Sequence, residues 1–279
     1  MSTWLVTGCS SGIGRGIAEA ALARGEQVVV TARKPETVAD LVAQYPETAL
    51  AVALDVTDEA SIASAVAAAQ AKFGTIDILI NNAGYGYRAA VEEGEKSGID
   101  EVFQTNVFGP VNLMKAVLPG MRAQKSGAIV NLSSIAAVCA APGSGYYAAT
   151  KAALESISEA LYQEVGPLGI KVMVVEPGAF KTHFFDTSLK GTAVKIEDYT
   201  PTAGQRRKEV AINKGDQPGD PAKGGKVIVD TILKDKPPFR LALGSDAVAY
   251  IKEIGELKKA EYGAWAEISK TTDRDDLKK

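Results

Sequence analysis

Cysteine and histidine are scarce in this chain, which has two cysteines and one histidine among its 279 residues. Cys9 lies in a glycine-rich segment and Cys139 in an alanine-rich one, a spacing that provides neither a disulfide framework nor a set of metal ligands. We therefore expect both cysteines to be packing residues and the protein to have no metal site. The one histidine, His183, is expected to lie in a loop.

Long apolar runs and a large excess of either charge are also missing. No stretch reaches the roughly 18 apolar residues that a membrane span needs, and the run at residues 4–6 is too short for the core of a secretory signal. The 31 basic and 34 acidic residues give a net charge of −3, which recruits neither nucleic acid nor an anionic membrane. These features favour a cytoplasmic protein that acts on small molecules.

Short apolar runs alternate with helical patterns along the whole sequence. Continuous runs of Val, Ile and Leu indicate strands covered on both faces, as in parallel sheets between helices. The order predicts an α/β fold: a doubly wound (Rossmann) parallel sheet of about seven strands with helices on both faces, in a single domain over residues 1–279. The expected strands are residues 4–6, 27–31, 50–54, 76–80, 128–132, 170–175 and 239–243, and late helices are expected at 222–233 and 247–268.

Residues 186–222 are rich in Lys, Gly, Thr and Asp and have little periodicity. We interpret them as a mobile lid over a substrate, with a plain surface insertion as the alternative. Residues 206–208 within this segment are three basic residues, expected on a solvated face and alternatively facing an anionic substrate. The charged residues 270–279 are expected to fray.

A glycine-rich turn follows the first predicted strand. Gly8, Gly12 and Gly14 remove Cβ atoms that would keep the backbone away from a pyrophosphate, and the helix that begins near Gly12 directs N–H groups and a positive dipole end at the same place. The turn therefore predicts a dinucleotide site. Its expected contacts also include Ser10, Ser11 and Ile13.

Tyr147 and Lys151 lie four residues apart in a helical pattern, so their side chains share one helix face, and Ser134 precedes Tyr147 by thirteen positions. An ordinary phenol has a pKa of about 10. An ammonium at about 4 Å, in a medium of effective dielectric about 20, stabilises the phenolate by about 4 kcal/mol. We expect this charge to bring the pKa of Tyr147 toward neutrality, where the hydroxyl can act as a general acid or base.

Several motifs together resemble the short-chain dehydrogenases/reductases over residues 4–182. The glycine turn has the TGxxxGxG spacing of the simpler enzymes in that family, and Tyr147 with Lys151 forms its YxxxK motif. Between and after them, in the family's order, stand Asn81-Asn82-Ala83-Gly84, Asn106, Asn131-Leu132-Ser133-Ser134 and the segment from Pro177-Gly178 to Thr182.

The resemblance implies catalytic roles for four residues. Tyr147 would give a proton to the substrate oxygen, Ser134 would orient that oxygen, and Lys151 would also bind the nicotinamide ribose. Asn106 would hold a water that links Lys151 to solvent. The neighbouring Tyr146 is a poorer candidate because Thr150, four residues on, carries no charge, and Ser133 points to the other side of its strand from Ser134.

The resemblance also implies the remaining cofactor contacts. Asp55 and Val56 would bind the adenine, with a helix cap as the alternative role of Asp55; we assign that cap to Thr57 or Asp58. The ribose would be lined by Asn82, Ala83 and Gly84 together with Tyr147 and Lys151, and the carboxamide would be covered by Pro177, Gly178 and Thr182.

The end of the second predicted strand indicates which dinucleotide binds. A carboxylate there would bind the 2′-hydroxyl of NAD, but the sequence has Ala32 followed by Arg33. A guanidinium can pair with a 2′-phosphate, helped by the hydroxyls of Ser10 and Ser11. The sequence therefore favours NADP(H), with NAD(H) as the alternative.

The substrate is less sharply indicated. Several aromatic residues and one loop are expected to surround the substrate: Tyr85, Tyr87, Phe180, Phe184, Phe185 and the loop 139–144. They favour an apolar ketone or aldehyde, for example a steroid-like or retinoid-like one. The prediction is an NADP(H)-dependent carbonyl reductase that forms a homodimer or homotetramer. The alternatives are an NAD-dependent alcohol dehydrogenase and a nucleotide-binding sensor without catalysis.

Overall fold

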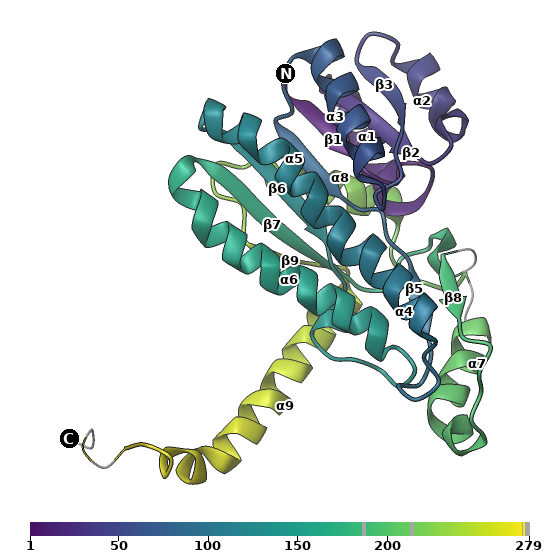
Figure 1. The fold of residues 1–279 in the computed structure, drawn as a ribbon, viewed down its shortest axis with the longest axis vertical. Coiled ribbons are helices and arrows are strands. Elements are labelled where there is room, and N and C mark those ends of the chain that lie inside the picture. Colours follow the sequence, from purple (N-terminus) through teal and green to yellow (C-terminus); the bar gives the residue numbers. More distant parts are fainter. Residues whose placement is uncertain (186–187, 213–214, 275, 277–279) are drawn as a thin grey trace.

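The computed structural model describes residues 1–185, 188–212, 215–274 and 276. Its centre is a seven-stranded parallel sheet with the strand order β3-β2-β1-β4-β6-β7-β9 (Figure 1). This is the doubly wound sheet that the sequence predicts. The strands are β1 Thr3–Val6, β2 Gln27–Ala32, β3 Ala49–Ala53, β4 Ile78–Asn81, β6 Gly127–Leu132, β7 Ile170–Pro177 and β9 Arg240–Leu243.

The two faces of the sheet bury separate apolar cores, because neighbouring residues along a strand point to opposite sides. Val6 and Val28 belong to one core, and Leu5 and Val29 to the other. The first core is covered by α1 Gly12–Ala23, α2 Ala39–Gln44 and α8 Pro221–Ile232. The second is covered by α3 Glu59–Phe73, α5 Gly109–Gln124 and α6 Gly145–Val165.

Glycines end several helical segments. Gly25, Gly74 and Gly169 follow helical segments with φ angles of 81°, 86° and 78°, a left-handed conformation that side chains with a Cβ rarely adopt. The observed boundaries of the predicted strands and late helices differ from the expected ones by at most two residues. Strand β4 begins at Ile78 rather than at residue 76, because the Asp77 side chain instead accepts a hydrogen bond from Thr3 N at 2.8 Å.

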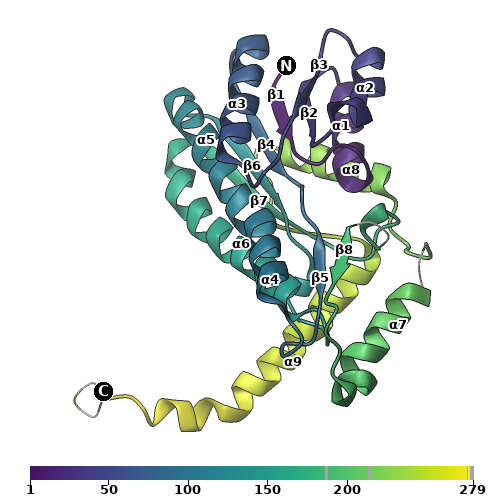
Figure 2. The same cartoon turned by 45° about the vertical axis from the view of Figure 1, so that its right-hand side comes forward.

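The predicted lid contains short elements that its sequence does not reveal. A turn at His183–Phe185 precedes the predicted lid. The lid itself includes strand β8 Leu189–Gly191, which pairs in parallel with β5 Gly86–Arg88 (Figure 2). Two further turns, Glu197–Tyr199 and Thr200–Gly204, lead into α7 Gln205–Ile212. Residues 186–187 and 213–214 of the predicted lid lie outside the described residues.

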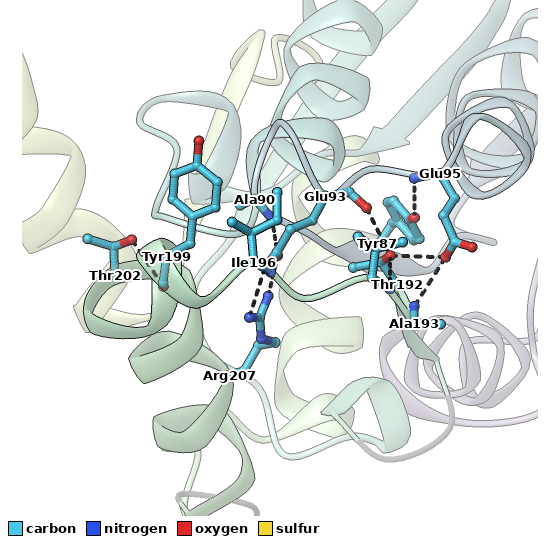
Figure 3. A network of polar contacts seen from close by, with 11 residues as sticks. Tyr87, Ala90, Glu93, Glu95, Thr192, Ala193, Ile196, Tyr199, Thr202 and Arg207 are labelled. Carbon is cyan, nitrogen blue, oxygen red and sulfur yellow. Dashed lines mark hydrogen bonds and ion pairs between the residues drawn. The ribbon is translucent and has the colours of Figure 1, made fainter.

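The buried carboxylate of Glu93 ties this segment to the loop between β5 and α4 Lys96–Phe103 (Figure 3). It accepts hydrogen bonds from Ala90 N at 2.9 Å and Ile196 N at 3.0 Å, and Arg207 Nη1 lies 2.6 Å from its Oε2. The hydrogen bonds from Arg207 hold the pKa of Glu93 down at about 2. The described part of the segment is therefore anchored through a charged side chain.

Helix α9 Ser245–Lys270 extends away from the rest of the molecule (Figures 1 and 2). Residues 255–265 are all exposed, including Leu257, Tyr262 and Trp265. Within the described ranges, no helix is both long enough and apolar enough to cross a membrane. In the predicted frayed tail, residues 275 and 277–279 lie outside the described part of the chain.

Candidate functional site

The predicted site residues meet at one edge of the sheet, where β1, β4, β6 and β7 end. Gly8 follows β1, Asn82 follows β4, Ser134 lies two residues after β6, and Gly178 follows β7. Parallel strands present their carboxyl ends to the same crevice, which is where doubly wound folds bind ligands.

The glycine turn is held in shape by Asn82. Gly8 and Gly12 have φ angles of 72° and 62°. The Asn82 amide donates to Thr7 O at 2.8 Å and to Gly8 O at 3.2 Å. A Cβ at Gly14 would lie 2.2 Å from Asn82 Nδ2, so only glycine fits at that position. Asn82 was predicted at the ribose; its side chain bonds to the turn, and the ribose contact stays a prediction.

Thr7 and Cys9 also fix the turn. The Thr7 hydroxyl donates to Ile80 O and accepts from Asn82 N and Ala83 N, which joins the end of β1 to the end of β4. Cys9 is buried and its N–H donates to Thr31 O at 2.9 Å, so the turn lies beside the end of β2. Burial raises the pKa of the Cys9 thiol to about 12, as expected of a packing residue.

The first turn of α1 has the features of a phosphate cradle. Ser11 is the N-cap residue, yet its side chain makes no capping hydrogen bond, so the first N–H groups of α1 are not capped by a side chain. The side chain of Ile13 is partly buried against the core. A Cβ at Gly12 would lie 3.2 Å from Thr182 Cγ2. Thr182, which was predicted to cover the carboxamide, therefore lies against the glycine turn.

Tyr147, Ser134 and Lys151 converge as predicted from their spacing. Tyr147 and Lys151 lie on α6, and the Ser134 side chain lies close enough to the Tyr147 hydroxyl to act on its pKa. Lys151 Nζ lies 5.9 Å from the centre of the Tyr147 ring and donates to Leu132 O at 2.7 Å. A carbonyl oxygen placed between the two hydroxyls could receive hydrogen bonds from both.

The two competing residues point elsewhere. The Tyr146 hydroxyl donates to Val91 O at 2.6 Å. The Ser133 hydroxyl donates to Glu155 Oε1 at 2.5 Å. Neither hydroxyl is therefore directed at the Tyr147 and Lys151 pair.

The ionisation of the pair differs from the expectation. Burial raises the pKa of Tyr147, and the Ser134 side chain and the charge of Arg88 only partly oppose that effect. Burial also lowers the pKa of Lys151 to about 8, although the charge of Glu155 raises it. The prediction that the ammonium acidifies Tyr147 is wrong for this structure, because desolvation outweighs charge attraction when both groups are buried.

Asn106 lies in a π-helical turn, Gln104–Phe108, between α4 and α5. Its side chain accepts from Tyr85 N at 3.1 Å and donates to Tyr85 O at 2.8 Å and to Thr150 Oγ1 at 3.1 Å. A Cβ at Gly84 would lie 3.0 Å from Asn106 Oδ1 and 3.5 Å from Lys151 Nζ, so Gly84 separates the two side chains. Such turns frequently occur at functional sites.

The region predicted to bind adenosine contains two exposed carboxylates, Asp55 and Asp58. Asp58 caps α3 by accepting from Ala60 N at 2.9 Å, which confirms one of the two caps predicted there. Asp55 instead accepts from the backbone and hydroxyl of Thr57, and these bonds lower its pKa, with a further contribution from the charge of Arg33. Arg33 is exposed directly after β2, while Ala32 and Val56 are buried.

The segment after β7 is fixed by Asp246, a residue that sequence reasoning missed. Asp246 Oδ2 accepts from Ala179 N at 2.7 Å, and a Cβ at Gly178 would lie 2.3 Å from its oxygens. Pro177 ends β7 immediately before. The only available signal was an acidic residue in the first turn of α9.

The predicted aromatic pocket is only partly formed by the expected residues. The Phe184 ring lies 5.6 Å from the Tyr147 ring, beside the site. Tyr87 and Phe180 are instead core residues: they are 3% and 7% exposed, and the Tyr87 hydroxyl accepts from Glu95 N. The side chain of Phe185 lies outside the described residues. His183 is exposed in the turn beside Phe184.

The ring of Tyr85 lies under Lys190 Nζ at 4.8 Å, and burial raises the pKa of the Tyr85 hydroxyl to about 12.

In the predicted loop 139–144, Gly143 O accepts from Ala89 N at 3.1 Å, and Cys139 is partly exposed rather than packed. Across the part of the chain that the structure describes, no group of three or more His, Cys, Asp or Glu is placed to hold a metal ion.

Comparison with known proteins agrees with this geometry. A family model described as short chain dehydrogenase matches residues 2–192. The chain belongs to that family. It is thus an oxidoreductase of the short-chain dehydrogenase type.

Two relatives and one solved structure show how far the similarity extends. Oxidoreductase BOA17 of Botryotinia fuckeliana is 39% identical over 267 residues, covering 95% of this enzyme and 97% of the relative. A 3-ketodihydrosphingosine reductase of Bacteroides thetaiotaomicron is 38% identical over 86% of this enzyme and 87% of the relative. A short-chain dehydrogenase from Streptomyces avermitilis has a crystal structure with a TM-score of 0.91, 44% identity and 98% coverage of both chains.

Proposed function

We propose that this enzyme is an NADP(H)-dependent reductase that converts an apolar ketone or aldehyde to the alcohol. The observation that carries the proposal is the convergence of Ser134, Tyr147 and Lys151 at the sheet edge that also holds the glycine turn. A proton donor, an orienting hydroxyl and a cation beside a phosphate cradle are the parts that hydride transfer to a carbonyl requires.

The residues present fit a dinucleotide. The uncapped first turn of α1 and the glycines without Cβ atoms at positions 8, 12 and 14 suit a pyrophosphate. Gly84 leaves space next to Lys151 for a ribose. When bound, the reduced nicotinamide supplies the hydride that reaches the carbonyl carbon.

The chain's own residues would handle the oxygen and the proton. Ser134 donates a hydrogen bond to the carbonyl oxygen and holds it beside Tyr147. The Tyr147 hydroxyl then transfers its proton to that oxygen as the carbon is reduced. Lys151 stabilises the resulting phenolate, which takes up a proton from solvent to restore the phenol and complete the cycle. Burial raises the pKa of Tyr147, so its hydroxyl carries the proton that this step requires.

Support for NADP(H) over NAD(H) comes from the end of β2. Ala32 offers no carboxylate to a 2′-hydroxyl, and Arg33 is exposed close enough to Asp55 to lower the pKa of that carboxyl. Support for a keto substrate comes from the Phe184 ring beside Tyr147 and from the printed name of one relative, a reductase of 3-ketodihydrosphingosine. A cytoplasmic location stays a prediction from composition.

The test compares two neighbouring tyrosines. With NADPH and a panel of ketones, aldehydes and quinones, we expect Tyr147→Phe to lower kcat/KM by about 100- to 10,000-fold, because the proton donor is lost. Tyr146→Phe is the matched control and should stay within about threefold of the wild type, since its hydroxyl bonds only to Val91 O. NADPH binding by both variants should be unchanged, which separates catalysis from folding. Wild-type turnover by Tyr147→Phe would remove Tyr147 from the reaction.

A further inference from the structure

Arg88 is a cation beside the site that the proposed reaction does not use. It is the last residue of β5, which packs against α6, the helix that carries Tyr147. Side chains alternate along a strand. Tyr87 packs its ring 6.2 Å from Tyr146, and Arg88, on the other face of β5, interacts electrostatically with Tyr147.

Among the described residues, no carboxylate pairs with this charge. The Arg88 side chain is partly buried, and its Nε is buried with no hydrogen-bond partner among the described residues. A second cation, Arg206 of α7, lies near enough that its charge and the effect of burial both lower the pKa of Arg88. By contrast, Arg15 and Arg207 both pair with carboxylates.

A partly buried guanidinium with a buried, unpartnered N–H group is unfavourable unless something else pairs with it. Here the missing partner would come from a ligand, because β5 packs against the helix that carries the catalytic hydroxyl and the charge of Arg88 acts on that hydroxyl. The planar fork of a guanidinium matches a carboxylate with two parallel hydrogen bonds. The nearby Phe184 ring gives the same space an apolar wall.

We propose that Arg88 is a binding residue for a carboxylate carried by the substrate, so that the enzyme reduces oxo acids: compounds with a ketone or aldehyde at one end, an apolar body and a carboxylate. This inference rests on the proposed reductase function and narrows its substrate class.

The experiment uses matched pairs of substrates with the same carbonyl. NADPH consumption is measured with 4-oxopentanoate and 4-benzoylbutyrate and with the methyl ester of each. We expect the wild type to prefer each acid by about 10- to 100-fold in kcat/KM, the effect of a hydrogen-bonded charge. Arg88→Met should bring the ratio close to one, and Arg88→Lys, which keeps the charge without the fork, should retain part of it.

Lys190→Met is the control for a general loss of positive charge. Lys190 lies on β8, the strand paired with β5, and its ammonium is 2.8 Å from Glu101. Its removal should leave the acid-to-ester ratio unchanged. A wild-type ratio near one, or a ratio that Arg88→Met leaves unchanged while the esters are still reduced, would overturn the carboxylate site and leave the reductase function intact.

A binding measurement tests the carboxylate site even if the enzyme reduces none of the acid and ester pairs. Calorimetry with 4-phenylbutyrate and 4-phenylbutyramide, in the presence of NADP and separately of NAD, should show at least tenfold tighter binding of the carboxylate to the wild type. Arg88→Met, checked for folding by its thermal melting curve, should bind both compounds alike. Equal affinities in the wild type would overturn the site even if the proposed reaction also failed.

Discussion

At the scale of single residues, burial shifts Tyr147 and Lys151 in opposite senses. The pKa of the phenol rises and that of the ammonium falls to about 8, because a buried site disfavours the charged form of each. The pair is therefore closer to a neutral state than two solvated side chains would be. Bound nucleotide would bring further charge to this site.

Arg33 is the residue on which the proposed cofactor preference depends. We expect Arg33→Asp to move the NADP-to-NAD ratio of kcat/KM by about 10- to 100-fold toward NAD, because a carboxylate repels a 2′-phosphate and accepts from a 2′-hydroxyl. Steady-state kinetics with both cofactors measures the ratio. Lys236→Asp, an exposed change of the same charge between α8 and β9, serves as the control. An unchanged ratio in Arg33→Asp would contradict the assignment.

The sequence predicts the residues of the site wherever they lie at strand ends or on one helix face. Ser134, Tyr147 and Lys151 meet because a strand end and a helix turn bring them together locally. Arg88 and Asp246 could not be found in the same way. Their partners lie far along the chain: Asp246 holds the backbone of Ala179, 67 positions away.

At the scale of elements, Glu93 joins the loop after β5 to the segment between β8 and α7. Its side chain is fully buried, so its pairing with Arg207 is little screened by solvent. Thr192 adds a second link, since its hydroxyl donates to Glu93 O at 2.9 Å and to Glu95 Oε2 at 3.0 Å (Figure 3).

We expect Glu93→Gln to lower the free energy of unfolding by about 3 kcal/mol, because it leaves Arg207 without its buried partner. Chemical denaturation measures this change, and hydrogen exchange should rise first in residues 192–207. The adjacent Glu92→Gln is the control; that exposed side chain accepts only from the Tyr199 hydroxyl, and its loss should cost less than about 1 kcal/mol. Equal effects of the two changes would contradict this role.

The ionisation of Glu93 makes the free energy of unfolding depend on pH in a defined direction. The pKa of Glu93 is about 2 in the folded protein, below its ordinary value of 4.5. Its stabilisation is therefore complete above about pH 4.5 and is lost as the pH falls toward 2. Glu93→Gln should flatten the stability profile in that window.

Elements were predictable where their own residues specify them. The seven strands of the main sheet and helices α8 and α9 appear within two residues of their expected ends. Strands β5 and β8 were not predicted, because three residues carry too little periodicity and the pairing of Tyr87 with Lys190 joins distant parts of the chain. Helix α7 has no apolar stripe, and Arg207 anchors it instead.

At the scale of the whole molecule, exposed apolar side chains occur along α5, α6 and the turns beside them. Phe108, Ile157, Tyr162 and Leu168 are between 37% and 51% exposed. Exposed apolar side chains are what an association surface buries. They support the proposal of a homodimer or homotetramer joined through these helices.

We expect the double change Phe108→Asp and Ile157→Asp to shift the protein to monomers, because charges at the centre of an apolar interface lose their hydration. Light scattering coupled to size-exclusion chromatography gives the mass. Val227→Asp, on the exposed side of α8, should leave the assembly unchanged. A monomeric wild type, or an unaltered mass in the double variant, would show that this face is not the interface.

Helix α8 packs on α1 so closely that a Cβ at Gly225 would lie 2.2 Å from the carbonyl carbon of Gly16. Ile17 and Ile228 share the core between them. During synthesis, the helix behind the glycine turn must therefore wait for some two hundred further residues before its inner face is shielded from water. A nascent chain or a truncated product that stops before α8 would leave that apolar face bare, and such products should be ready substrates for chaperones and proteases.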